Sequence, residues 1–213
     1  MRSLTRTRQV STGYDLTDNG RTRMNTKRFH FPALGLAVIG ATLISAGCAS
    51  HRGAEPMAKI SGDGDITVPT TYRSWARFVP TVDKVDAGQV REIYINPVGV
   101  TTRKGEAFPA GTVSVMEIYG ARKDSAGKVI KNAEGRLIKG ELSRIFVMAK
   151  GEGWGASLPA GTVGNGDWLY GAWLSDGTTA ATADFAACRS CHLPMAATDF
   201  VARYDEHFAT RMR

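Results

Sequence analysis

Alternation of apolar and polar side chains predicts four β-strands in this chain. The pattern is clearest at residues 112–119 (TVSVMEIY), which are rich in β-branched and aromatic residues. Similar short runs occupy residues 89–96, 142–150 and 168–174. Turn-forming residues separate the runs, as at residues 124–127 (DSAG), and they favour hairpin connections between antiparallel strands.

Three short helices are predicted beside these strands. The first opens at Tyr72 after a threonine cap and carries Trp75 and Phe78. Residues 180–191 are rich in alanine, and residues 198–210 have an amphipathic pattern that begins with a threonine cap. Together the patterns predict one α+β domain, a mainly antiparallel β-sheet with flanking short helices.

The N-terminal segment has the pattern of an export signal. A basic pair at residues 27–28 precedes an apolar stretch over residues 31–44, and small residues follow up to Cys48. Met24 is an alternative start, in which case residues 1–23 are an over-extended reading of the gene. The sequence therefore predicts export, with the body of the protein in the periplasm.

Cys48 is a candidate lipidation site. It follows three small residues, as the cysteine of a bacterial lipoprotein does, and diacylation there would anchor the protein to a membrane. Ser45 departs from that pattern, because a larger aliphatic residue is usual at its position. Two alternatives stay open: cleavage near Ala46 or Ala49 with release into the periplasm, and an uncleaved membrane anchor.

The chain divides into a signal segment over residues 1–47, a flexible tether over residues 48–67 and a folded domain over residues 68–213. Most of the net charge of +7 lies in the signal segment, so the folded domain is nearly neutral. This distribution argues against nucleic-acid binding. Three cysteines are too few for a disulfide-dense secreted scaffold.

The strongest chemical signal is the run Cys188-Arg189-Ser190-Cys191-His192 near the C-terminus. C-x-x-C-H is the attachment sequence for one covalent haem c, whose vinyl groups the two thiols reach from about one helical turn apart. His192 then lies under the iron as an axial ligand. The export signal agrees with this interpretation, because the attachment requires export with reduced thiols.

A zinc site and a redox disulfide are the alternatives for these cysteines. Zinc needs about four ligands, so Cys188 and Cys191 would have to recruit His192 or His207. A thioredoxin-like pair follows a strand in a βαβ unit, whereas this pair follows an antiparallel region. The sequence therefore favours haem iron as the metal.

The second axial position of the iron decides the function. Strand alternation within residues 112–119 divides the side chains between two faces: Thr112, Ser114, Met116 and Ile118 on one, and Val113, Val115, Glu117 and Tyr119 on the other. Met116 projects from a rigid strand and is the candidate ligand, with His207 and Met148 as further candidates. The alternative is that Met116 is simply a core residue.

From Tyr72 onward the sequence resembles the cytochrome P-460 and cytochrome c′-beta family of bacterial haem proteins. The resemblance depends on the order of several short motifs: residues 72–75 (YRSW), 93–96 (IYIN), 108–113 (FPAGTV), 146–150 (FVMAK), Trp168 with Trp173, and residues 188–192 (CRSCH). It implies a mainly antiparallel sheet, a haem c attached near the C-terminus and a homodimer.

The resemblance also implies three alternative functions. Cytochromes P-460 oxidise hydroxylamine and carry a lysine cross-linked to the porphyrin, but Met116 stands at the corresponding position here. Relatives of the c′-beta type place an apolar side chain over a five-coordinate iron and bind nitric oxide. A methionine that binds iron, together with His192, implies instead electron transfer with a redox partner protein. This last function is the one we expect, and gas binding and hydroxylamine oxidation follow it in that order.

Several charged residues have simpler expected roles. Lys150 and Arg203 are expected to face solvent, and Arg189 either balances a haem propionate or faces water. Glu117 is a poor candidate for a proton acceptor at the haem, because strand alternation turns it away from Met116.

Overall fold

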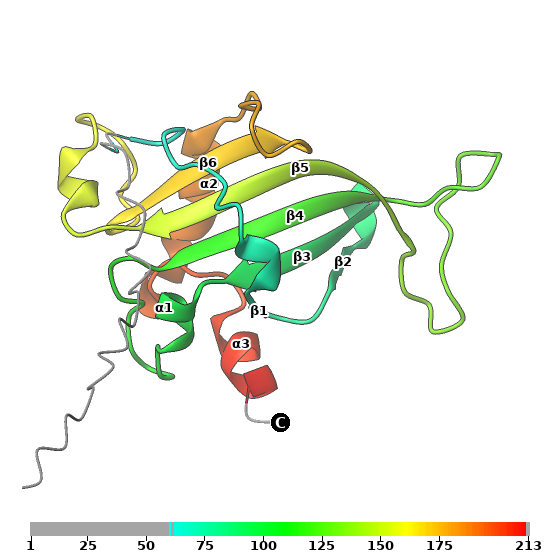
Figure 1. The fold of residues 1–213 in the computed structure, drawn as a ribbon, viewed down its shortest axis with the longest axis horizontal. Helices are drawn as coiled ribbons and strands as arrows, with labels where there is room; N and C mark the ends of the chain where they lie inside the picture. The colour runs from blue at the N-terminus through cyan, green and yellow to red at the C-terminus, as the bar shows by residue number, and fades with distance from the viewer. Residues whose placement is uncertain (1–59, 61, 212–213) are drawn as a thin grey trace, which may run out of the picture. The chain divides into compact units, whose positions relative to one another are not determined.

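The computed structural model describes residue 60 and residues 62–211. Six strands form one antiparallel sheet in the order β1-β3-β4-β5-β6, and β2 pairs with the same edge of β3 as β1 does (Figure 1). The strands are β1 (Ala76–Arg77), β2 (Val82–Lys84), β3 (Gln89–Ile95), β4 (Val113–Ala121), β5 (Lys139–Lys150) and β6 (Trp168–Leu174). The mainly antiparallel sheet predicted from the sequence is therefore confirmed.

The four strands predicted from alternation are β3, β4, β5 and β6. The strand predicted over residues 142–150 is longer than expected and begins at Lys139. Between β4 and β5, residues 122–138 extend beyond the sheet as an arm with tight turns (Figure 1), and the first turn closes between Gly127 and Asp124 (N···O 3.0 Å). The short strands β1 and β2 were not predicted, because two or three residues are too few to show a period.

Helices in the described residues are short. The α-helices are α1 (Pro97–Val100), α2 (Phe185–His192) and α3 (Tyr204–Arg211), and four 3-10 helices accompany them. None of these helices is long and apolar enough to cross a membrane. The sheet with a few short helices agrees with the α+β prediction.

The predicted helix boundaries need correction. The first helix is a single 3-10 turn, Tyr72–Ser74, so Trp75 and Phe78 lie beyond it. Residues 180–184 are not helical, because the Asp184 carboxylate caps α2 by accepting a hydrogen bond from the Ala187 backbone N–H (3.2 Å). Thr198 ends a 3-10 helix instead of starting the last one.

Residues 62–67, which the sequence places in the tether, pack against β6. The Ile66 side chain is buried in the core, and the Ile66 carbonyl accepts a hydrogen bond from Trp173 Nε1 (2.9 Å). The Gly64 N–H donates to the Tyr170 carbonyl (2.7 Å), and the Asp63 carboxylate accepts from the Tyr170 N–H (3.0 Å). Ordered packing therefore starts before Val68, and the expected start of the folded domain is too late. The signal segment and Cys48 lie outside the described residues.

The two faces of the sheet pack against different parts of the protein. One face carries a core that includes Tyr94, Val115 and Leu169. The opposite face turns toward α2, α3 and a second core that includes Phe78, Phe108 and Trp168. Strand alternation therefore divides β4 as the sequence predicts, and the second face holds a cavity.

Candidate functional site

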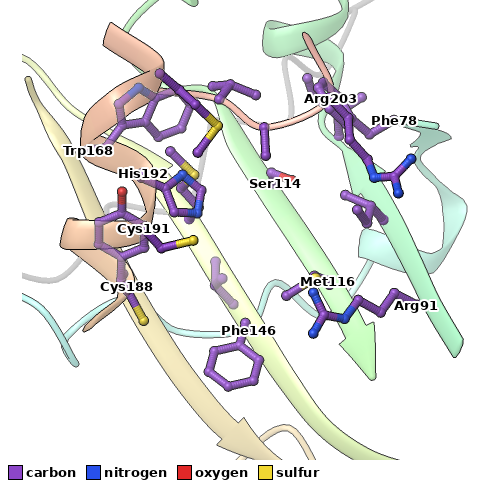
Figure 2. Close-up of a pocket in the computed structure, with 18 of the residues that line it drawn as sticks. Phe78, Arg91, Ser114, Met116, Phe146, Trp168, Cys188, Cys191, His192 and Arg203 are labelled. Atoms are coloured by element: carbon purple, nitrogen blue, oxygen red, sulfur yellow. The ribbon is translucent and has the colours of Figure 1, made fainter. Parts of the chain in front are cut away.

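A cavity of about 440 Å³ lies between the sheet and the C-terminal segment. Strands β3, β4, β5 and β6 supply one wall, and α2 with residues 201–203 supplies the other (Figure 2). The volume falls within the roughly 300–1,000 Å³ of known small-molecule and cofactor sites. Most lining side chains are apolar, three are basic (Lys84, Arg91 and Arg203), and none of the described lining residues is acidic.

All four residues that the sequence assigns to haem binding line this cavity: Cys188, Cys191, His192 and Met116. The two cysteines lie one turn apart on α2 and have free thiols, Cys188 half-buried and Cys191 exposed. Figure 2 shows the Cys191 thiol and the His192 ring on the cavity side of α2, and Met116 reaching the cavity from β4.

The His192 ring is oriented by a backbone carbonyl. Its Nδ1 lies 2.7 Å from the carbonyl oxygen of Phe200, and because a carbonyl oxygen only accepts, Nδ1 carries the proton. The lone pair on Nε2 is then free to bind a metal, and the hydrogen bond makes the imidazole a stronger donor. Tyr170 packs edge-on against the ring, with centroids 5.4 Å apart.

The loop that presents the Phe200 carbonyl has an unusual backbone. Asp199, Phe200 and Arg203 have φ angles of 52°, 60° and 59°. This left-handed conformation costs non-glycine residues about 1–2 kcal/mol each, so the surroundings must hold it. The Asp199 carboxylate accepts a hydrogen bond from the Phe108 N–H (2.9 Å) and pairs with Lys150 Nζ (2.8 Å). Lys150 is therefore not solvated as expected, since 14% of its side chain is exposed.

Arg189, inside the C-x-x-C-H motif, is turned away from the cavity. Only 1% of the residue is exposed, and its guanidinium makes two bonds to the Asp63 carboxylate (2.7 and 2.8 Å). The guanidinium also donates to the Trp168 carbonyl (3.3 Å). Both roles expected for Arg189 are therefore wrong: the side chain anchors α2 to β6 and to Asp63 in residues 62–67.

Met116 lies at the centre of the sheet, where its cross-strand neighbours are Ile93 on β3 and Phe146 on β5. All three side chains line the cavity, and Met148 does so as well. His207 does not line it. Its Nδ1 lies 2.6 Å from the Phe78 carbonyl, and its ring stacks on the Phe78 ring at 4.1 Å. Of the candidate second ligands, His207 is thus committed to the core.

Glu117 is fully buried on the opposite face of β4. Its carboxylate accepts hydrogen bonds from the hydroxyls of Tyr72 (2.5 Å), Tyr94 (3.2 Å) and Tyr119 (2.7 Å), and Arg73 pairs with it at 2.7 Å. Burial alone would raise the pKa of Glu117, but these hydrogen bonds and the Arg73 charge outweigh it and lower the pKa. Sequence reasoning placed Glu117 on this face and missed the cluster, whose members come from three separate segments.

The residues present fit a haem c. The cavity offers two thiols one turn apart and an imidazole with a free Nε2. Two buried donors of lining residues, Arg91 Nε and Trp168 Nε1, have no hydrogen-bond partner in the protein, as expected where a bound group supplies acceptors. Among the described residues, no three His, Cys, Asp or Glu side chains come together to hold a metal ion, so the zinc alternative has no ligand set there.

Comparison with known proteins agrees with this assignment. The family model for cytochrome P460 matches residues 69–203, a segment that contains every residue lining the cavity. No curated protein matches the chain. Because the matched segment covers more than half of the sequence, the chain belongs to the cytochrome P460 family of haem-binding cytochromes.

Proposed function

We propose that this protein is an exported c-type cytochrome with one covalent haem, and that it transfers electrons with His192 and Met116 as the two axial ligands. The observation that carries the proposal is that these two side chains line the same apolar cavity from different elements, α2 and β4. A c-type haem supplies one-electron exchange at its iron when it is bound.

Cys188 and Cys191 hold the cofactor in this proposal. Each thiol would add across one vinyl double bond of the haem, with sulfur on one carbon and hydrogen on the other, so the attachment would need no oxidant. Burial and the nearby carboxylates of Asp63 and Asp184 raise the pKa of the Cys188 thiol, which keeps it protonated at neutral pH. Arg189 fixes α2, and with it both sulfur atoms, to the sheet.

His192 and Met116 set the electronic properties. The Phe200 carbonyl makes His192 a strong donor, and a thioether ligand at the second position raises the reduction potential. Ile93, Ile118 and Phe146 line the same cavity as Met116 and make this part of its wall apolar. Two fixed protein ligands in apolar surroundings would favour electron transfer, because little has to move when the charge of the iron changes.

Gas binding is the second candidate function. The apolar side chains around Met116, with Phe146 among them, suit a small uncharged ligand if Met116 leaves the iron free. Hydroxylamine oxidation has less support. Met116 replaces the cross-linking lysine, and no Asp or Glu among the described lining residues faces the cavity to accept protons.

The absorption and electron paramagnetic resonance spectra of the ferric protein, purified from cells competent in cytochrome maturation, test the proposal. We expect one added macrocycle by mass, a low-spin signal and a methionine-to-iron charge-transfer band that Met116→Ala abolishes. Met148→Ala is the matched control, since Met148 also lines the cavity, and it should keep the band. High-spin iron that binds nitric oxide in the unaltered protein would support gas binding. A red-shifted, cross-linked chromophore would support hydroxylamine oxidation.

The location and assembly of the protein complete the proposal. The export pattern of residues 1–47 supports a periplasmic protein, and Cys48 supports a lipid anchor. Membrane fractionation of the unaltered protein and Cys48→Ser tests the anchor: loss of the variant from the membrane fraction is the expected result. We also propose a homodimer, as the resemblance to the cytochrome P-460 and cytochrome c′-beta family implies, and sedimentation of the purified protein tests it.

A further inference from the structure

Two arginines line the cavity wall without an acidic partner inside it. Arg91 projects from β3, and Arg203 comes from the loop that precedes α3 (Figure 2). Sequence reasoning placed Arg203 at the surface and assigned no role to Arg91. Three of the described lining residues are basic and none is acidic, so the cavity is suited to an anionic group.

Arg91 has an unsatisfied donor. The residue is half-buried, Nη2 donates to Gln89 Oε1 (3.1 Å), and the buried Nε has no partner in the protein. Burial and the positive charge of Arg203 lower the pKa of the Arg91 guanidinium. An unpaired buried donor on a charged group is costly, so an acceptor is expected here.

Arg203 is held beside the cavity by a strained backbone. Its φ of 59° is in the left-handed region, which a long side chain rarely adopts. Glu206 pairs with Nη1, and 40% of the Arg203 side chain stays exposed. A guanidinium has further N–H donors, so this pairing leaves Arg203 able to bind a second carboxylate.

Arg91 and Arg203 lie on the side of the cavity away from Cys188 and Cys191 (Figure 2). Arg189 ties α2 to β6 through the Trp168 carbonyl, whereas Arg91 lies on β3. Three inter-strand steps separate β6 from β3 in the sheet, or about 14 Å at about 4.8 Å per step. In a haem the two propionates leave from the edge opposite the vinyl groups. Thioethers at Cys188 and Cys191 would therefore direct the propionates toward the side of the cavity that holds Arg91 and Arg203.

We propose that Arg91 and Arg203 form a carboxylate-binding pair that receives the haem propionates and raises the reduction potential. The inference rests on the proposed haem c site. Arg–carboxylate pairs make strong, charge-assisted hydrogen bonds, and an acceptor at Arg91 would satisfy its free Nε. Positive charge beside the cofactor stabilises its reduced form, which carries one more electron.

The reduction potentials of Arg91→Gln and Arg203→Gln test the pair, with Arg91→Lys as a variant that keeps the charge. Arg122→Gln is the matched control, because Arg122 lies in the arm between β4 and β5 and does not line the cavity. We expect the mass of both glutamine variants to show that they keep the covalent haem. At a fixed potential, their ratio of oxidised to reduced protein should rise about tenfold, which corresponds to a reduction potential about 59 mV lower. Arg91→Lys should stay closer to the unaltered protein.

If the haem-loaded glutamine variants have the same reduction potential as Arg122→Gln, the proposed role of Arg91 and Arg203 is overturned, while the proposed function still stands. Unaltered protein without haem would overturn both. A free oxyanion is the other ligand that two arginines can bind. The reduction potentials are therefore also measured with added sodium sulfate at constant ionic strength. Sulfate independence of the unaltered protein is the expected result. A sulfate-dependent potential that is lost in Arg91→Gln would overturn the assignment to the propionates.

Discussion

Met116 and Glu117 are neighbours on β4 whose side chains have opposite surroundings. Met116 lines the cavity, whereas Glu117 is fully buried on the other face among Tyr72, Tyr94 and Tyr119. The division follows from the period of two in a strand, so the sequence predicts it from alternation alone. Alternation also places Tyr119 on the face of Glu117, but Tyr72 and Arg73 reach Glu117 because residues 72–73 pack over the sheet, which no local pattern reports.

Glu117→Gln is expected to destabilise the protein by about 2–3 kcal/mol, because it removes the charge that several hydrogen bonds and Arg73 share. The folded-state pKa of Glu117 is lowered, so its contribution is fully present above the unfolded pKa of about 4.3 and is lost as the pH falls through the folded value. Urea unfolding at pH 7 and at acid pH measures both effects.

The variant should therefore lose less stability on acidification than the unaltered protein. Glu141→Gln, at an exposed position of β5, is the control and should change the unfolding free energy by less than about 0.5 kcal/mol. Equal acid sensitivity in Glu117→Gln and the unaltered protein would contradict the assignment.

At the scale of elements, α2 and the loop after it act together. The cysteines lie on the helix, but the carbonyl that orients His192 comes from Phe200, eight residues later. The predicted continuous helix over residues 198–210 is wrong here, because the left-handed residues 199, 200 and 203 break it. Amphipathic spacing indicates a helical face, yet the ion pair of Asp199 with Lys150 on β5 outweighs the local helical preference.

Asp199→Asn is expected to raise the reduction potential of the haem-loaded protein. The substitution keeps a residue that tolerates the left-handed backbone but removes the charge that binds Lys150. A looser Phe200 carbonyl makes His192 a weaker donor, which favours the reduced iron. Spectroelectrochemical titration measures the shift. Lys150→Gln disrupts the same pair and should move the potential in the same direction, so opposite shifts would contradict this role.

At the scale of the whole domain, residues 62–67 and α2 hold each other in place. Asp63 and Arg189 are 126 residues apart, and their ion pair joins residues 62–67 to α2 across β6. A composition rich in Gly and Asp predicts a tether, but the same small polar residues let this segment follow the sheet edge closely.

Asp63→Asn is expected to cost about 3–5 kcal/mol of folding free energy, because it leaves the Arg189 guanidinium buried without its counter-charge. Chemical denaturation gives the difference. Asp205→Asn is the control: Asp205 pairs with Lys104 where both side chains are more than half exposed, so its loss should cost at most about 1 kcal/mol. Similar losses in the two variants would show that Asp63 does not anchor α2.

The sequence by itself determined the structural features that depend only on residues close together along the chain. It predicted four strands, the two faces of β4, and thiols and an imidazole adjacent on one helix, because strand and helix periods are local properties. Only the tertiary structure decided which charges are paired. Arg189 is buried against Asp63, Lys150 binds Asp199, and Arg91 and Arg203 line the same cavity. Such pairings depend on which distant segments pack together, and no spacing along the chain records that.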